Sequence, residues 1–345
     1  MVLLCSTEML LGCTVTEKNI ECLMLICCGT LGVTKTILFR IYAKNLTDNY
    51  SSAVNDYKTI KNPRDYFIMR RHTYIGKLLF CCLLGSSYFS CFIIAAIPVL
   101  GGVKTDQNVT NETVFEYIVP STCALEYFRI PTSMRTIVLI VQTLALFTTC
   151  NTYMVCKGND TLFLSIVLHL CGQIKILNRK YVDLDGTSSH DRLIALIKRH
   201  IYLIRKANKL SETINIALLM QLFLLSIILC ILGFQLILAI KLNNVIVIGK
   251  SLIMIFAFVA QLSLYSFIGD YLISQMEEIA LSVYQSAWYK LSENTKRNVI
   301  FVIMRREFPV ALKAGNFIMV NLSTYMNILK TSLSYLSVLR VMIET

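Results

Sequence analysis

The residues whose types and spacing most suggest a function lie in the apolar C-terminal segment 315–345, which carries a recurring set of polar side chains. On a helical wheel these polar side chains fall within about 60° of one direction. They are Ser323, Thr324, Asn327, Lys330, Thr331 and Ser334. Val338, Val341 and Met342 continue the same stripe toward the C-terminus. Lipid does not accommodate such a stripe, so it faces either water or protein.

Two interpretations of this stripe stay open. A helix lining a water-filled path would present polar groups to the water and close the path at an apolar constriction near its mouth. One chain supplies one such stripe, so a pore would require several copies around an axis. The alternative is hydrogen bonding between helices of one bundle, for which Ser, Thr and Asn are commonly used in membranes.

Enzyme chemistry finds no support in the sequence, which contains no G-x-S-x-G, H-E-x-x-H, P-loop or dinucleotide-binding motif. The adjacent Glu277 and Glu278 fit a solvated helix face or an intersubunit salt bridge better than paired acid–base carboxylates. His169 is expected to be a packed or capped histidine. The 13 cysteines show no metal-ligand spacing, so we expect no metal and no cofactor.

Composition places the chain in a membrane. Of its 345 residues 55% are hydrophobic and 16% charged, and its mean hydropathy is +0.62. A soluble domain of this length would need more charge to cover its surface. The net charge of +12 comes from basic clusters between apolar runs, a pattern of membrane topology rather than of nucleic-acid binding.

Six apolar segments are long enough to cross a bilayer as helices, so we predict an all-α, polytopic membrane bundle. The segments are 21–39, 75–100, 134–156, 212–240, 245–272 and 315–340. The third continues past a polar break, "KGND" at Lys157–Asp160, and we expect its lower half to extend into the cytoplasm or to pack against neighbours.

Basic residues assign the sidedness. Segments 40–74, 174–210 and 273–313 hold seven, nine and six Lys or Arg and should face the cytoplasm, whereas 101–133 and 241–250 hold two each. The outer segment 101–133 carries glycosylation sequons at Asn108 and Asn111. The C-terminus is then outside. We expect residues 1–20 to be the remnant of a first span and its outer loop, with seven spans in all; a six-span protein with a short outer tail is the alternative.

The C-terminal third resembles the insect odorant receptor family. The similarity rests on "AWYKL", then "MRREFPVALKAGNF", then "LSTYMNILKTSLSYLSVLR", and extends upstream to about Thr16. The resemblance implies a seven-span subunit of a ligand-gated, non-selective cation channel of four subunits in the plasma membrane of a sensory neuron. It implies a shared co-receptor subunit as partner, a small volatile ligand and surrounding membrane lipid, and no nucleic acid.

Aligned on Ser334-Tyr335, the family's gate positions fall on Val338 and Met342, with Val341 between them facing the pore. The co-receptor is polar at the position of Val341, so this chain resembles an odour-tuning subunit. The resemblance further divides the chain into a bundle at 21–272 with the odorant pocket in its outer half, an inter-subunit anchor region at 273–314, and a pore-lining helix at 315–345.

The family's pocket lies between the outer halves of its second, third, fourth and sixth spans, and an apolar cavity suits a volatile ligand. The corresponding residues here are Met24, Cys28, Tyr88, Phe92, Ile93, Met134, Val138, Met254 and Phe258. Tyr88 is the most informative of them, because a phenol can both stack and donate a hydrogen bond. For each residue, plain core packing is the alternative role.

Three other classes of membrane protein were weighed. Gustatory receptors resemble this chain at Thr324-Tyr325, but Thr331 and Ser332 stand where that family has Gln and Phe. A G-protein-coupled seven-span receptor remains as the second hypothesis. A transporter would show repeat symmetry or paired broken helices, and the single "KGND" break has no counterpart.

Overall fold

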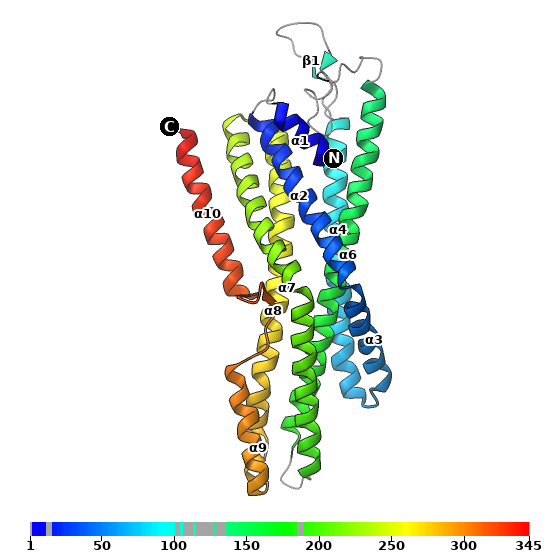
Figure 1. Ribbon diagram of the computed structural model, residues 1–345, viewed down its shortest axis with the longest axis vertical. Helices are drawn as coiled ribbons and strands as arrows, with labels where there is room; N and C mark the ends of the chain where they lie inside the picture. Colours follow the sequence, from blue (N-terminus) through cyan, green and yellow to red (C-terminus); the bar gives the residue numbers. More distant parts are fainter. Residues whose placement is uncertain are drawn as a thin grey trace.

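The computed structural model describes residues 2–11, 16–100, 104–105, 113–114, 127, 135–184 and 190–344. Long helices running roughly along one axis dominate it (Figure 1). The helices are α1 (Val2–Leu11), α2 (Thr16–Ile41), α3 (Ala43–Thr59), α4 (Pro63–Leu100), α6 (Arg135–Val182), α7 (His190–Lys241), α8 (Val245–Gln285), α9 (Glu293–Met304) and α10 (Leu322–Glu344). Short 3₁₀ turns at Trp288–Lys290 and Arg305–Glu307 flank α9.

Helices cover all six predicted spans. Among the described residues, four segments are long and apolar enough to cross a membrane: Asn19–Ile41, Lys157–Val182, His190–Lys241 and Val245–Gln285. The helices α4 and α10 contain the second predicted span and most of the last, and the outer part of α6 contains nearly all of the third.

The polar "KGND" segment interrupts the apolar run but not the helix. The helix α6 runs unbroken from Arg135 to Val182, and its inner half is the most enclosed part of the bundle. In its most apolar window 78% of residues are buried, against 22% for the corresponding window of α8. The inner half of α6 therefore packs against α4, α7 and α8, as the alternative expectation had it.

Two small antiparallel ribbons were not predicted. Strand β1 (Lys104–Thr105) pairs with β2 (Thr113–Val114), and β3 (Lys313–Ala314) pairs with β4 (Ile318–Met319). The second ribbon corrects the predicted start of the last span, because the helix begins at Leu322 instead of 315. The chain turns at Gly315 and Asn316, both with φ of +64°, a conformation that interrupts a helix and suits glycine and asparagine.

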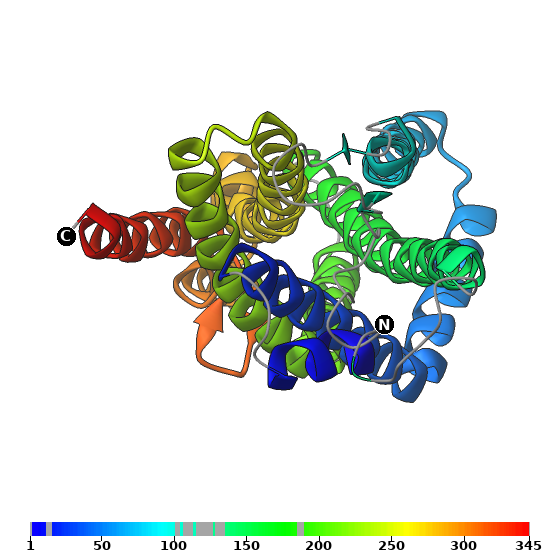
Figure 2. The same cartoon turned by 90° about the horizontal axis from the view of Figure 1, so that it is seen from above.

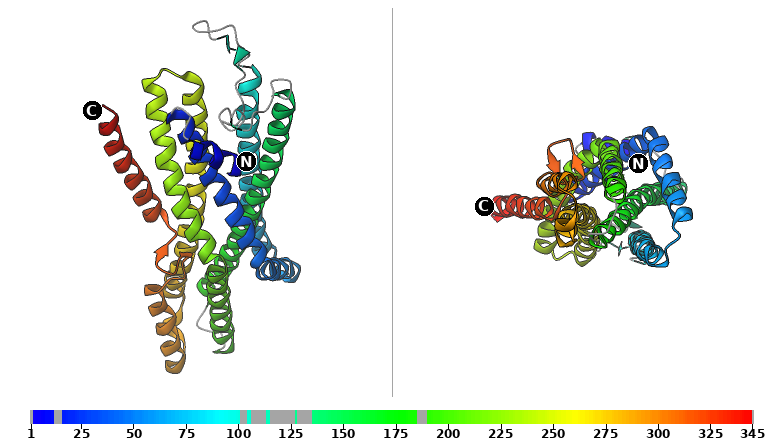
Figure 3. Two further views of the ribbon diagram at one scale, coloured as in Figure 1. Left: turned by 45° about the horizontal axis from the view of Figure 1, so that its top comes forward. Right: turned by 90° about the horizontal axis from the view of Figure 1, so that it is seen from below.

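The β3–β4 ribbon fastens the base of α10 to the bundle (Figure 3). On α7, the Ser211 hydroxyl donates to the Ala311 carbonyl at 3.2 Å and accepts from the Lys313 amide at 3.0 Å. The Asn215 side chain accepts from the Asn316 amide at 3.0 Å. Asn321 then caps α10 by accepting from the Thr324 amide at 2.9 Å. Beyond this base, α10 leans away from the other helices (Figure 2).

Gly269 of α8 permits this fastening, because a Cβ there would lie 2.0 Å from the carbonyl oxygen of Val320. We expect Gly269→Ala to push the ribbon off α8 and to lower the free energy of unfolding by about 1–3 kcal/mol or more. Thermal unfolding of the purified protein in detergent would measure this loss. Gly249→Ala on the same helix meets no atom within 4 Å and serves as the control, which should be at least as stable as the parent. Equal stability of both variants would contradict the role of Gly269.

Candidate functional site

The last helix docks on the bundle through one edge and leaves its polar stripe uncovered. Ile328 and Leu329 pack against the hydrophobic core, and Leu336 lies over Gly233 of α7, where no larger side chain would fit without displacing it. The exposed polar residues of the stripe are Ser323, Asn327, Lys330, Thr331 and Ser334. Val338, one helical turn beyond Ser334, is 59% exposed. The backbone of Val341 and Met342 belongs to α10, but their side chains lie outside the described part.

Outside the polar stripe, the residues of α10 differ in their exposure. Ser332 is 9% exposed and faces the bundle, whereas Leu333 is 65% exposed. A single chain therefore covers only a narrow strip of this helix, and both the polar stripe and part of the apolar face remain available to something outside the chain. Arg340 is exposed near the outer end, as expected of a side chain that can reach the membrane boundary.

Four of the expected pocket residues belong to one continuous core. Met24 of α2 and Phe258 of α8 are buried in it, and Cys28 and Met254 pack against its edge. On α4, by contrast, Tyr88 is 56% and Phe92 72% exposed, and Ile93 is half-buried. Val138 lies on α6, but its side chain, like Met134 and the sequons at Asn108 and Asn111, falls outside what the structure describes.

A buried charged cluster lies within this core, about one helical turn from Phe258 on α8, and it was not predicted. The Lys35 ammonium of α2 donates to both carboxylate oxygens of Asp160 on α6, at 2.7 and 2.6 Å. The Gln261 amide of α8 donates to Asp160 at 3.1 Å and accepts from Lys157. Each of these four side chains belongs to a residue that is at most 5% exposed.

This cluster ties three helices together at one depth. Gln261 follows Phe258 by three residues, a rise of about 4.5 Å, and Lys35 follows Cys28 by seven, about 10 Å. The Lys35 ammonium also lies 5.7 Å from the centre of the Tyr265 ring. An ionisable residue within a span is expensive and persists only when paired. Lys35 inside the first apolar segment and "KGND" in the third were therefore the sequence signals for this cluster.

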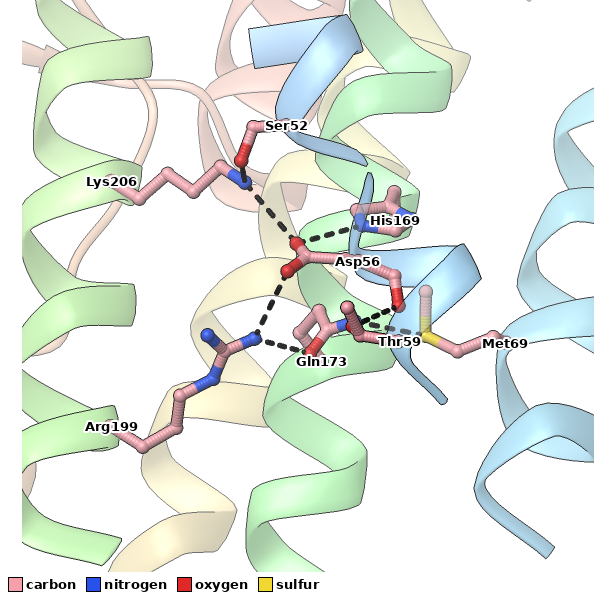
Figure 4. A network of polar contacts seen from close by, with 8 residues as sticks. All are labelled: Ser52, Asp56, Thr59, Met69, His169, Gln173, Arg199 and Lys206. Carbon is pink, nitrogen blue, oxygen red and sulfur yellow. Dashed lines mark hydrogen bonds and ion pairs between the residues drawn. The ribbon is translucent and has the colours of Figure 1, made fainter. Parts of the chain in front are cut away.

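A second polar network joins α3 to α6 and α7 (Figure 4). Asp56 of α3 accepts from His169 of α6 at 3.4 Å and pairs with Lys206 at 3.5 Å and Arg199 at 3.6 Å, both on α7. Arg199 also donates to Gln173 at 2.6 Å. His169 is thus a packed, hydrogen-bonded histidine, as expected, and a cavity of about 590 Å³ lies beside Asp56, Gln173 and Arg199.

Electrostatics favour the ionised form of Asp56. Burial by itself raises the pKa of this carboxyl, but the hydrogen bond from His169 and the charges of Lys206 and Arg199 outweigh burial and lower the pKa below its ordinary value. The carboxylate therefore holds α3 against α6 and α7 at neutral pH. Among the described residues no cluster of three metal-binding side chains occurs. Glu278, weighed above as part of an acidic pair, accepts from Lys175 of the same chain at 2.5 Å.

Comparison with known proteins shows which family the chain resembles. Residues 16–333 match the family described as 7tm Odorant receptor. The chain is 28% identical over 204 residues to Odorant receptor 13a of Drosophila melanogaster, covering 53% of this chain and 48% of that one. It is 24% identical over 211 residues to Odorant receptor 10 of Aedes albopictus, covering 59% and 55%. The chain thus matches about half the length of these curated relatives.

The fold has a solved counterpart. The insect olfactory receptor OR5 from Machilis hrabei, in complex with eugenol, superposes with a TM-score of 0.75 at 15% identity, over 99% of this chain and 87% of that one. A second structure of the same receptor gives a TM-score of 0.76 at 14% identity, over 98% of this chain and 85% of that one. The predicted helical, polytopic membrane bundle is thereby confirmed.

The buried ion pair yields the first prediction from this site. We expect Asp160→Leu to lower the free energy of unfolding by about 3–5 kcal/mol, because it leaves the Lys35 ammonium buried without its carboxylate. Adding Lys35→Met removes that charge, so the double variant should recover most of the loss. Thermal unfolding in detergent of the parent, the single variant and the double variant would measure both effects. A double variant no more stable than the single one would contradict the pairing.

The polar network around Asp56 yields a second prediction. Because the pKa of Asp56 is lowered from 3.8, its contacts stabilise the fold above that pH, and the contribution is lost as pH falls through the folded-state pKa. Asp56→Asn should therefore cost about 1–2 kcal/mol near neutral pH, and its stability should approach that of the parent only as the pH falls below 3.8 and through the folded-state pKa. Unfolding would be followed at several pH values. Asp48→Asn, an exposed carboxylate of α3, is the control; a pH-independent deficit in Asp56→Asn would rule out this linkage.

Proposed function

The chain belongs to the insect odorant receptor family, and we propose that it is an odour-tuning subunit of an odorant-gated, non-selective cation channel. As a member of that family it is a multi-pass membrane receptor and not an enzyme. The proposed channel is a tetramer formed with a co-receptor subunit in the plasma membrane of a sensory neuron. In it α10 lines the pore and the outer half of the bundle holds the odorant.

The observation that carries this proposal is the uncovered polar stripe of α10. Asn327, Thr331 and Ser334 are exposed on a helix whose neighbouring edge is fastened to α7 and α8. Four such helices around an axis would enclose a water-filled path. Val338 is exposed on the outer side of this stripe, and we assign it, with Val341 and Met342, to an apolar gate that closes by excluding water.

The proposed ligand is a small, mostly apolar volatile. The Machilis receptor with the same fold binds eugenol, and we extend that class of small organic ligand to this chain. The proposed pocket lies among Met24, Cys28, Met254 and Phe258, with Tyr88, Phe92, Ile93, Met134 and Val138 on the two other helices that would enclose it. Methionine side chains adapt to ligands of different shape, which suits broad tuning.

The region 273–314 is proposed to hold the subunits together on the cytoplasmic side. Its support is a group of large apolar side chains that a single chain leaves exposed. They are Leu281, Tyr284, Tyr289, Ile300, Phe301, Met304 and Phe308. Exposed apolar surface of this extent outside the membrane marks a protein–protein contact.

Cysteine accessibility tests the pore assignment, because a side chain in an aqueous path reacts with charged thiol reagents and one facing the bundle does not. Whole-cell current would be recorded from the chain co-expressed with an insect co-receptor and stimulated with a panel of volatiles. In Ser334→Cys, a methanethiosulfonate reagent should remove most of the odorant-evoked current. Ser332→Cys, the same substitution two residues away on the buried side, is the matched control and should keep its current, as should the parent with its native cysteines.

Two outcomes would overturn the proposal. Equal block of Ser334→Cys, Ser332→Cys and the parent would mean that α10 does not line the path. A response to volatiles that depends on nucleotide exchange by a G protein, with no odorant-evoked current, would instead favour the G-protein-coupled alternative.

A further inference from the structure

A groove of about 510 Å³ runs along the outside of the bundle between α3, α4 and α6. Its rims carry apolar side chains that the chain leaves uncovered: Tyr50 is 52%, Phe80 42% and Leu162 38% exposed. Neither the proposed odorant pocket nor α10 contributes a lining residue. The groove therefore needs an explanation of its own.

The groove changes in polarity along its length. Gly76 of α4 packs against Ser165 of α6, where an added Cβ would lie 3.2 Å from the hydroxyl oxygen, and this contact sets the register of the two antiparallel helices. On the outer side of this contact the lining is Phe80 and Leu162, and beside Gly158 no atom lies within 4 Å of an added Cβ. On the inner side the polar side chains of His72, Thr73 and His169 join the lining.

One basic side chain lies beside this contact. Lys77, the residue after Gly76 on α4, is exposed and lines the groove, and no carboxylate lies among the lining side chains. The preceding segment 40–74, part of which lines the inner end of the groove, holds seven Lys or Arg against three Asp. Of these, Asp56 is already engaged by His169, Lys206 and Arg199. The charge balance therefore favours an anionic group beside Lys77.

The groove also lies at a suitable depth. The apolar run of α4 begins at about residue 75, and the basic segment before it marks the cytoplasmic side, so Lys77 lies near the inner membrane boundary. From there the apolar part extends toward the membrane interior. An occupant with an anionic head at this boundary and an apolar tail above it is a phospholipid.

We propose that this groove binds one anionic phospholipid of the inner leaflet, its headgroup beside Lys77 and an acyl chain along Phe80, Leu162 and the open space at Gly158. Basic residues at the membrane surface attract anionic lipids. Because Tyr57 and His169 line the groove and Asp56 binds His169, the lipid adjoins the network that holds α3 in place. Lipid occupancy and the attachment of α3 are thus coupled.

Filling the groove from within tests the site. Gly158→Leu introduces a side chain at a position where an added Cβ meets no atom within 4 Å, so the purified full chain should fold and elute as one species. Native mass spectrometry with added phosphatidylserine should then show at least a fivefold loss of bound lipid relative to the parent. Gly85→Leu on α4, where an added Cβ likewise meets nothing within 4 Å, is the matched control outside the groove and should retain the lipid.

A second variant tests the headgroup and keeps the proposal falsifiable if Gly158→Leu fails to fold. The parent should bind phosphatidylserine in preference to phosphatidylcholine, and Lys77→Gln should reduce that preference. Unchanged phosphatidylserine binding in both variants would overturn the site. Equal binding of the two lipids by the parent would overturn the anionic assignment. A change in subunit number in Gly158→Leu, without loss of lipid, would identify the groove as a contact between chains.

Discussion

Burial of charge in a membrane-embedded bundle is the constraint that organises this structure. Asp160 is 1% exposed and Lys35 4% exposed, in surroundings where an isolated charge is strongly unfavourable. Their mutual contact, with Gln261 supplying a further hydrogen bond, is what permits both groups to be there. Separating α2, α6 and α8 at this depth would leave a carboxylate or an ammonium without its partner. These three helices are therefore held to one another more firmly than apolar packing in lipid alone would achieve.

The buried cluster of Lys35, Asp160 and Gln261 lies between the outer half of the bundle and the base of α10. On α8, Phe258, Gln261 and Gly269 follow one another inward, so core packing, the ion cluster and the ribbon contact share one helix. The ribbon is also bonded to α7 through Ser211 and Asn215. A displacement of α8 relative to α7 consequently reaches α10 at its base. A ligand shifts such an equilibrium only by the difference in its affinity for the two arrangements.

The sequence predicted the parts of the fold that depend on apolar length. Each of the six segments proposed from hydropathy lies wholly or largely in a helix, because a chain in lipid must satisfy its backbone internally. The sequence was a poorer guide where contacts between distant residues decide the structure. The polar "KGND" gave no sign of its partner, yet Asp160 is stabilised in a continuous helix by Lys35, which lies 125 residues away. The start at 315 was wrong because Gly315 and Asn316 take left-handed conformations that bonds from Asn215 stabilise.

The candidate site likewise has features that the sequence predicts and features that depend on tertiary packing. The polar stripe of α10 could be drawn from the helical period alone, and its residues are exposed together on the described part of that helix. Periodicity could not tell that Ser332 faces the bundle and Leu333 faces away, since that depends on how α10 leans from α7 and α8. Nor could it place Tyr88, whose exposure reflects the packing of α4 on α6 through a different face.

Attachment weakens from the centre of the molecule to its edge, and the charges explain why. The Lys35–Asp160 pair is enclosed on all sides, whereas Asp56 meets its partners at 3.4–3.6 Å near a cavity open to solvent, where the same charges are better hydrated and attract one another less. The helix α3, with only three buried residues, is held by this weaker set and by the rim of a groove. An element fastened in this way has a lower local stability than the bundle it covers. It is consequently the described helix whose position an occupant of the groove would affect most.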